Sequence, residues 1–131
     1  MSIPTKTPIG TAWLDEHGIL RHRFDPGVRV SASAAADTLK ILAELLNGRR
    51  APAIVDITGV GHADPEARQI FAKMGASAPE IAMAILVRPD ENPESAVQAF
   101  LFSTHAPDRP VAVFEDEKKA VAWARTFLPT T

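Results

Sequence analysis

Polar residues that could carry out chemistry gather in one segment, residues 55–71, which reads VDITGVGHADPEARQIF. An apolar run there leads into Asp56 and Thr58, and Asp64 and Pro65 then precede a run with helical spacing. Sites in α/β proteins often lie where a strand ends and the next helix begins. Three kinds of site fit this position: a nucleotide-binding loop, a phosphorylated aspartate, and a structural turn.

The glycines of this segment do not complete a nucleotide-binding motif. Gly59 and Gly61 follow a predicted strand, but Asp64 stands where a dinucleotide loop has its third glycine. A carboxylate there would repel a pyrophosphate at the start of the helix. The chain also lacks the GK[ST] sequence of a phosphate-binding P-loop. The pattern therefore disfavours nucleotide binding by this loop.

Asp56 has the position of a phosphoryl-accepting aspartate, but its expected neighbours are missing. Such sites need further acids to hold Mg²⁺, and no acidic pair is evident at the neighbouring strand ends. We expect the Asp56 carboxylate to accept hydrogen bonds from N–H groups of the loop that follows. The histidines lack the spacing of a helical metal site, cysteine is absent, and no G-x-S-x-G elbow occurs. The sequence therefore predicts no metal, no cofactor and no enzymatic activity.

The end of the segment has the residues of a helix start. Asp64 is predicted as the N-cap, Pro65 as the first helical residue, and Glu66 meets the positive end of the helix dipole. These residue types stabilise a helix whether or not they also bind a partner.

The elements that position this segment alternate along the chain. TAWLDEHGILRHRF (residues 11–24) reads as a β-hairpin turning at Gly18, and a helix follows with Ser31 or Ser33 as its cap. Further strands are predicted at 51–58, 81–87 and 111–114, and further helices at about 64–75, 95–104 and 115–128. The order β-β-α-β-α-β-α-β-α predicts an α/β fold with a mostly parallel sheet and an antiparallel first strand.

Composition restricts the class of protein. A chain of 131 residues with net charge -2 and a pI near 6.1 fits one domain without the basic surface that nucleic acid requires. No apolar run reaches the roughly 20 residues of a membrane helix. The lack of cysteine suits a cytoplasmic protein. We expect residues 1–10 to be a flexible leader and residues 11–129 to form the domain.

The segment and the order of elements together resemble the STAS domain, the fold of bacterial anti-sigma-factor antagonists. Residues 55–60 (VDITGV) match the apolar-Asp-apolar-Ser/Thr-Gly-Val part of the family motif, and Asp64 matches the first residue of its Asp-Ser-Ser-Gly part. The last predicted strand and helix, AVFEDEKKAVAWARTFL, also resemble those of uncharacterised bacterial STAS-like proteins. The resemblance covers about residues 10–128.

The resemblance implies a protein that binds other proteins. In the family, a partner kinase phosphorylates the second serine of the motif and thereby releases the complex. Here Glu66 stands at that position, so the hydroxyl is replaced by a permanent carboxylate. The resemblance then implies a regulatory interaction module, or a homodimer, whose contact surface includes Asp56, Thr58, Gly59, Asp64 and Glu66.

A binding module for a small or lipid-like molecule is the alternative. Related folds with helices on a sheet contain apolar pockets, and Phe100, Phe102 and Trp123 are the side chains predicted to line one here. Phe102 lies off the apolar stripe of its helix, so it is predicted either to pack under the following loop or to contact a partner or ligand.

Overall fold

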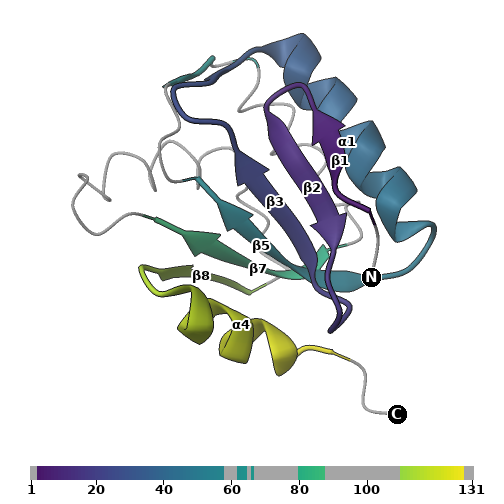
Figure 1. Cartoon of the computed structure of the whole chain (residues 1–131), viewed down its shortest axis with the longest axis vertical. Helices are drawn as coiled ribbons and strands as arrows, with labels where there is room; N and C mark the ends of the chain where they lie inside the picture. The colour runs from purple at the N-terminus through teal and green to yellow at the C-terminus, as the bar shows by residue number, and fades with distance from the viewer. Residues whose placement is uncertain (1–2, 58–61, 65, 67–79, 88–109, 129–131) are drawn as a thin grey trace.

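In the part of the chain that the structure describes, a six-stranded sheet has a helix on each face (Figure 1). The computed structural model describes residues 3–57, 62–64, 66, 80–87 and 110–128. In the order of the sheet the strands are β1 (Thr5–Thr7), β2 (Gly10–Leu14), β3 (Leu20–Phe24), β5 (Ala51–Asp56), β7 (Glu80–Leu86) and β8 (Val111–Phe114). The described helices are α1 (Ala32–Leu46) and α4 (Glu117–Arg125).

The pairing of the strands confirms the predicted mixed sheet. β1, β2 and β3 are antiparallel neighbours, whereas β3, β5, β7 and β8 run parallel to one another. β2 and β3 form the predicted hairpin, with Gly18 in its turn at a φ of 87°. Parallel strands need crossover connections, and α1 provides the one between β3 and β5.

Both described helices begin at the caps their sequences predict, but α4 ends at Arg125, three residues before the predicted end of this helix at 128. The Ser31 hydroxyl accepts a hydrogen bond from the Ala34 N–H at the start of α1, and Asn47 ends this helix in the left-handed conformation. Asp116 caps α4 by accepting from the Lys118 N–H at 2.8 Å. These caps fix where each helix starts relative to the strand before it.

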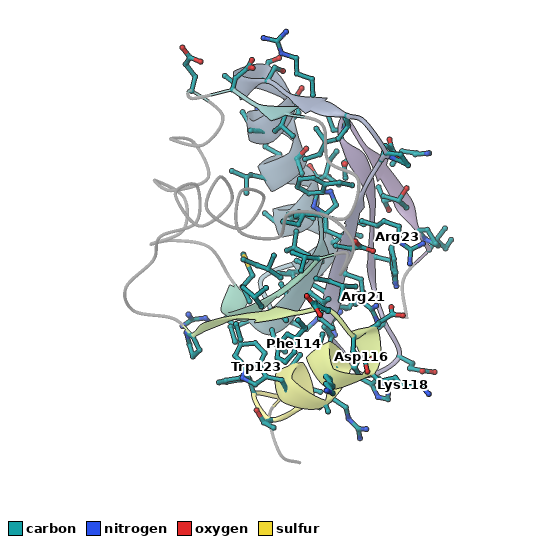
Figure 2. The ribbon with its side chains drawn as sticks, turned by 90° about the vertical axis from the view of Figure 1, so that its left-hand side faces the viewer. Arg21, Arg23, Phe114, Asp116, Lys118 and Trp123 are labelled. Atoms are coloured by element: carbon teal, nitrogen blue, oxygen red, sulfur yellow. The ribbon has the colours of Figure 1, made fainter. Side chains whose placement is uncertain are left out.

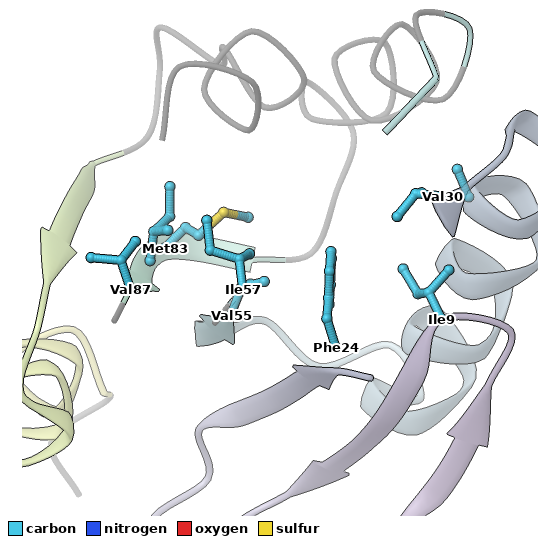
Figure 3. Close-up of a cluster of buried hydrophobic side chains, with 9 residues drawn as sticks. Ile9, Phe24, Val30, Val55, Ile57, Met83 and Val87 are labelled. Carbon is cyan, nitrogen blue, oxygen red and sulfur yellow. The ribbon is translucent and has the colours of Figure 1, made fainter. Parts of the chain in front are cut away.

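Alternating side chains bury the sheet on both faces. Ala53 packs in a cluster with Leu42 and Leu46 of α1, whereas the next residue, Ile54, packs with Ala120 and Ala124 of α4. A further cluster lies near the carboxyl end of β5 and includes Ile9, Phe24, Val30, Val55 and Ile57 (Figure 3). The strand ends that carry the candidate site therefore rest on a packed core.

The structure differs from the sequence prediction at the start of the chain, where a flexible leader was expected up to Gly10. β1 pairs with β2, Ile9 is fully buried, and the Thr7 hydroxyl oxygen lies 3.2 Å from Nε2 of the buried His22. The segment TKT has no apolar pattern that would predict a strand. Its order comes from pairing with the hairpin, so residues 5–10 belong to the sheet.

A second, two-stranded sheet was also not predicted. β4 (Arg29–Val30) pairs in parallel with β6 (His62–Ala63), with Arg29 opposite His62. This pair joins the chain before α1 to the chain after β5. The helices predicted at 64–75 and 95–104 lie outside the described residues, apart from Glu66, whose backbone is helical.

Asp15 holds the turn of the hairpin, and its replacement tests this role. Its Oδ1 accepts from the N–H groups of His17 at 2.9 Å and Ile19 at 3.0 Å, and Oδ2 lies 3.4 Å from Arg21 Nη1. We expect Asp15→Ala to lower the free energy of unfolding by about 2 kcal/mol, because partly buried donors lose their acceptor.

Asp15→Asn is the matched control in urea unfolding. Its amide oxygen can still accept from the two backbone groups, so most of the lost stability should return. Equal unfolding free energies for Asp15→Ala and the native protein would show that the turn forms without this side chain.

Candidate functional site

Asp56 lies at the carboxyl end of β5, where the sequence placed the start of the site. Its Oδ2 is 3.6 Å from Nε of Arg23, which is its register partner on β3. The carboxylate is mostly covered, whereas the Arg23 side chain is 60% exposed. The sequence predicted hydrogen bonds from the following loop, but residues 58–61 lie outside the described part of the chain. The structure assigns Asp56 an ionic partner on the neighbouring strand, and the hydrogen bonds from the following loop stay a prediction.

Asp64 contacts the segment that precedes α1 through both its backbone and its side chain. Its backbone N–H donates to the Val30 carbonyl oxygen at 2.9 Å, and its Oδ1 accepts from Arg29 Nε at 3.1 Å. The Arg29 side chain is 73% exposed and the Asp64 side chain 20%. The N-cap role of Asp64 involves residues that are mostly outside the described ranges, so it stays a prediction.

The surface around this contact is called the β4–β6 surface below and consists of Arg29, Ser33, Asp64 and Glu66. Ser33 lies in the first turn of α1, and both Ser33 and Glu66 are exposed. Val30, directly after Arg29, is 1% exposed and belongs to the core cluster that includes Ile57. This surface therefore lies beside a packed core, and β4 lies at the end of the molecule where α1 begins (Figure 1).

Of the other predicted site residues, the structure describes Trp123. Its ring packs 5.7 Å from that of Phe114 and 4.8 Å from that of Phe127, beside the core cluster under α4 (Figure 2). Thr58, Gly59, Phe100 and Phe102 lie outside the described residues. The ligand-binding alternative thus stays a prediction, and the described contacts of Trp123 are those of a packing residue.

Arg23 and Arg29 are the site residues that sequence reasoning missed. Each pairs with a carboxylate more than 30 positions away in the chain, as Arg29 does with Asp64 at a separation of 35. No local motif marks such partners. The sequence offered one indication: side chains alternate between the two faces of a β-strand, and this places Arg21 and Arg23 on the face opposite Leu20 and Phe24.

A hollow of about 390 Å³ lies far from these residues, at the amino end of β5. The hairpin turn and the end of α1 line it, and its charged members, Asp15, Glu16 and Arg49, have both signs. None of its lining residues was predicted as a site residue. Within the described ranges, no cluster of three or more His, Asp or Glu side chains is placed to hold a metal ion. Nor does any helix there have the length and apolar character to cross a membrane.

Comparison with solved structures identifies the class of fold. An uncharacterized protein of the DUF3478 family from Shewanella loihica PV-4, which has a SpoIIAA-like fold, superposes with a TM-score of 0.63. The match covers 95% of this chain and 98% of that chain, at 21% sequence identity. The chain is therefore a single α/β domain with the SpoIIAA-like, or STAS, fold, as its motif and order of elements predicted.

The family follows from the sequence itself. Residues 12–128 match the family described as a domain of unknown function, DUF7793, and the chain belongs to it. No curated protein matches the chain.

Proposed function

We propose that this protein is a non-enzymatic interaction module that binds a protein partner through the β4–β6 surface. The observation that carries the proposal is the anchoring of Asp64, which donates its backbone N–H to the Val30 carbonyl oxygen and accepts a bond from Arg29. The anchored chain leads directly to the exposed Glu66. A carboxylate is thereby presented to a partner from a fixed position, which lowers the entropy lost on binding.

The charges of this surface contribute little to folding. An ion pair whose arginine is 73% exposed adds at most about 1 kcal/mol, because water and salt screen it. The charged side chains of this surface are therefore not needed for folding stability and can serve to bind a partner. The partner that fits has a basic side chain for Glu66 and an acidic or hydrogen-bonding group for Arg29.

The resemblance to STAS domains supports the same surface. Glu66 matches the serine whose phosphorylation releases the partner in that family, and the fold is shared. A permanent carboxylate cannot be added or removed by a kinase. We therefore infer binding that does not depend on phosphorylation of this position.

Affinity capture from the native host tests the proposal. Tagged native protein, Glu66→Arg and Glu44→Arg are used side by side, and co-purified proteins are identified by mass spectrometry. Glu44 is an exposed carboxylate on α1, so its reversal changes the net charge equally without altering the β4–β6 surface. We expect a partner that the native protein and Glu44→Arg retain and that Glu66→Arg loses at least tenfold.

Circular dichroism of all three proteins shows that the fold is retained. The same proteins captured at the same levels by the native chain and Glu66→Arg would contradict the assignment of this surface. If both Glu66→Arg and Glu44→Arg lost the partner, binding would depend on the net charge of the protein rather than on Glu66.

A further inference from the structure

Neither of the two helices that the structure describes covers one face of the antiparallel part of the sheet. Lys6, Thr11, Trp13, Arg21 and Arg23 alternate with buried residues along β1, β2 and β3 and so share this face. In the described ranges α1 packs on the opposite face, and α4 packs on β5, β7 and β8. Lys6 is exposed and the Arg23 side chain is 60% exposed, so water reaches this face.

Trp13 occupies the middle of this face between two arginines. The guanidinium carbon of Arg21 lies 5.7 Å from the centre of the indole ring, and that of Arg23 lies 5.6 Å from it. Arg21 is held in turn by the carboxylates of Asp15 and Glu117, and 13% of its side chain is exposed (Figure 2). The ring is therefore preorganised before any partner arrives.

The chemistry of the face is that of a protein interface. Tryptophan and arginine are the residue types most enriched among side chains that dominate binding energy. A half-buried tryptophan with charged side chains beside it also matches the usual arrangement of an aromatic centre and a polar rim. This face is separate from the β4–β6 surface, so both can be occupied together.

The charges on and around the face indicate its partner. The three cations of this face are Lys6, Arg21 and Arg23; Arg23 pairs with the Asp56 carboxylate, and Arg21 pairs with those of Asp15 and Glu117. Three cations and three carboxylates leave the face without net charge, so charge does not draw an acidic peptide or a nucleic acid to it. A surface with both signs around a central aromatic can complement itself, because a two-fold axis places the cations of one copy opposite the carboxylates of the other.

We propose that this protein forms a two-fold dimer through the face of β1, β2 and β3 centred on Trp13. Three strands give a face of about 14 Å by about 17 Å, roughly 240 Å² per copy, which is well below the roughly 800 Å² per partner of a standard interface. The dimer should accordingly be weak, with a dissociation constant on the order of 100 µM.

Two-dimensional NMR of isotope-labelled protein at increasing concentration tests the proposal. The sequence contains two tryptophans, Trp13 and Trp123, and each gives one indole N–H signal. We expect the Trp13 signal to move as concentration rises to about 500 µM, as association on this scale requires. Trp123, which packs against Phe114 and Phe127, serves as the control within the same molecule, and its signal should stay in place.

Sedimentation equilibrium of variants locates the interface. Trp13→Ala and Arg23→Ala should each weaken association at least tenfold, whereas Glu44→Ala, on α1, should leave it unchanged. The Trp123 indole signal reports whether each variant is folded. A native protein that stays monomeric up to about 500 µM overturns the proposal. A dimer that survives in folded Trp13→Ala and Arg23→Ala also overturns it.

Discussion

Replacing Gly10 by alanine should lower the free energy of unfolding by about 3 kcal/mol or more, the upper range for a crowded substitution. Gly10 begins β2 and lies opposite Phe24 in the hairpin. A Cβ built at this position would stand 1.9 Å from the Arg23 carbonyl oxygen and 2.8 Å from its carbonyl carbon. These are backbone atoms of the partner strand, so no side-chain rotation can make room. Thermal unfolding followed by circular dichroism measures the loss.

Gly27→Ala is the control for this prediction. Gly27 has a φ of 70°, but a Cβ there would meet no atom within 4 Å. Its replacement should cost about 1 kcal/mol, from backbone strain alone. If both variants lost the same amount of unfolding free energy, the close approach of the β3 backbone would not be the reason that position 10 requires glycine.

Acidification should destabilise the protein through His22. This side chain is 5% exposed, and burial lowers its pKa from 6.5 to about 4, although the nearby Asp25 carboxylate acts in the opposite direction. The unfolded chain therefore binds a proton at a pH where the folded protein does not, and stability falls as pH drops from 6.5 towards 4. We expect a loss of about 2 kcal/mol between about pH 7 and about pH 5 and about 3 kcal/mol by about pH 4.

Comparison with His22→Gln separates this effect from other titrations. Glutamine can still exchange a hydrogen bond with the Thr7 hydroxyl, which lies 3.2 Å from His22 Nε2, but it does not titrate. Urea unfolding at several pH values should show the steep loss only in the native protein. Equal pH slopes for the two proteins would mean that His22 is protonated in the folded state at the same pH as in the unfolded chain.

The sequence predicted a helix or strand correctly wherever the residues of that element form a hydrophobic pattern by themselves. The stripe of Ala35, Leu42 and Leu46 predicted α1, and a continuous apolar run predicted β5. β1 was missed because Thr5–Thr7 has no pattern of its own and is ordered by β2 and His22. Pairing that depends on distant residues leaves no local signal, which also explains the missed β4–β6 pair.

Less of the candidate site than of the fold could be predicted, again because its contacts join residues that are distant in the sequence. Glu66 was assigned to the contact surface from its motif position, and its side chain is exposed. The ionic partners of Asp56 and Asp64 could not be predicted, because Arg23 and Arg29 reach them through strand pairing. Trp13 was not singled out either, since one aromatic residue in a hairpin does not show whether a helix will cover it.

The central claim is that the β4–β6 surface binds a protein partner, and a titration of isotope-labelled protein with the captured partner tests it most directly. Amide signals are followed by two-dimensional NMR for the native protein and for Glu66→Arg. The account predicts shifts concentrated at residues 29–33 and 62–66, and at least tenfold weaker binding for Glu66→Arg. Shifts concentrated instead on β2 and β3, or equal affinity of both proteins, would contradict it.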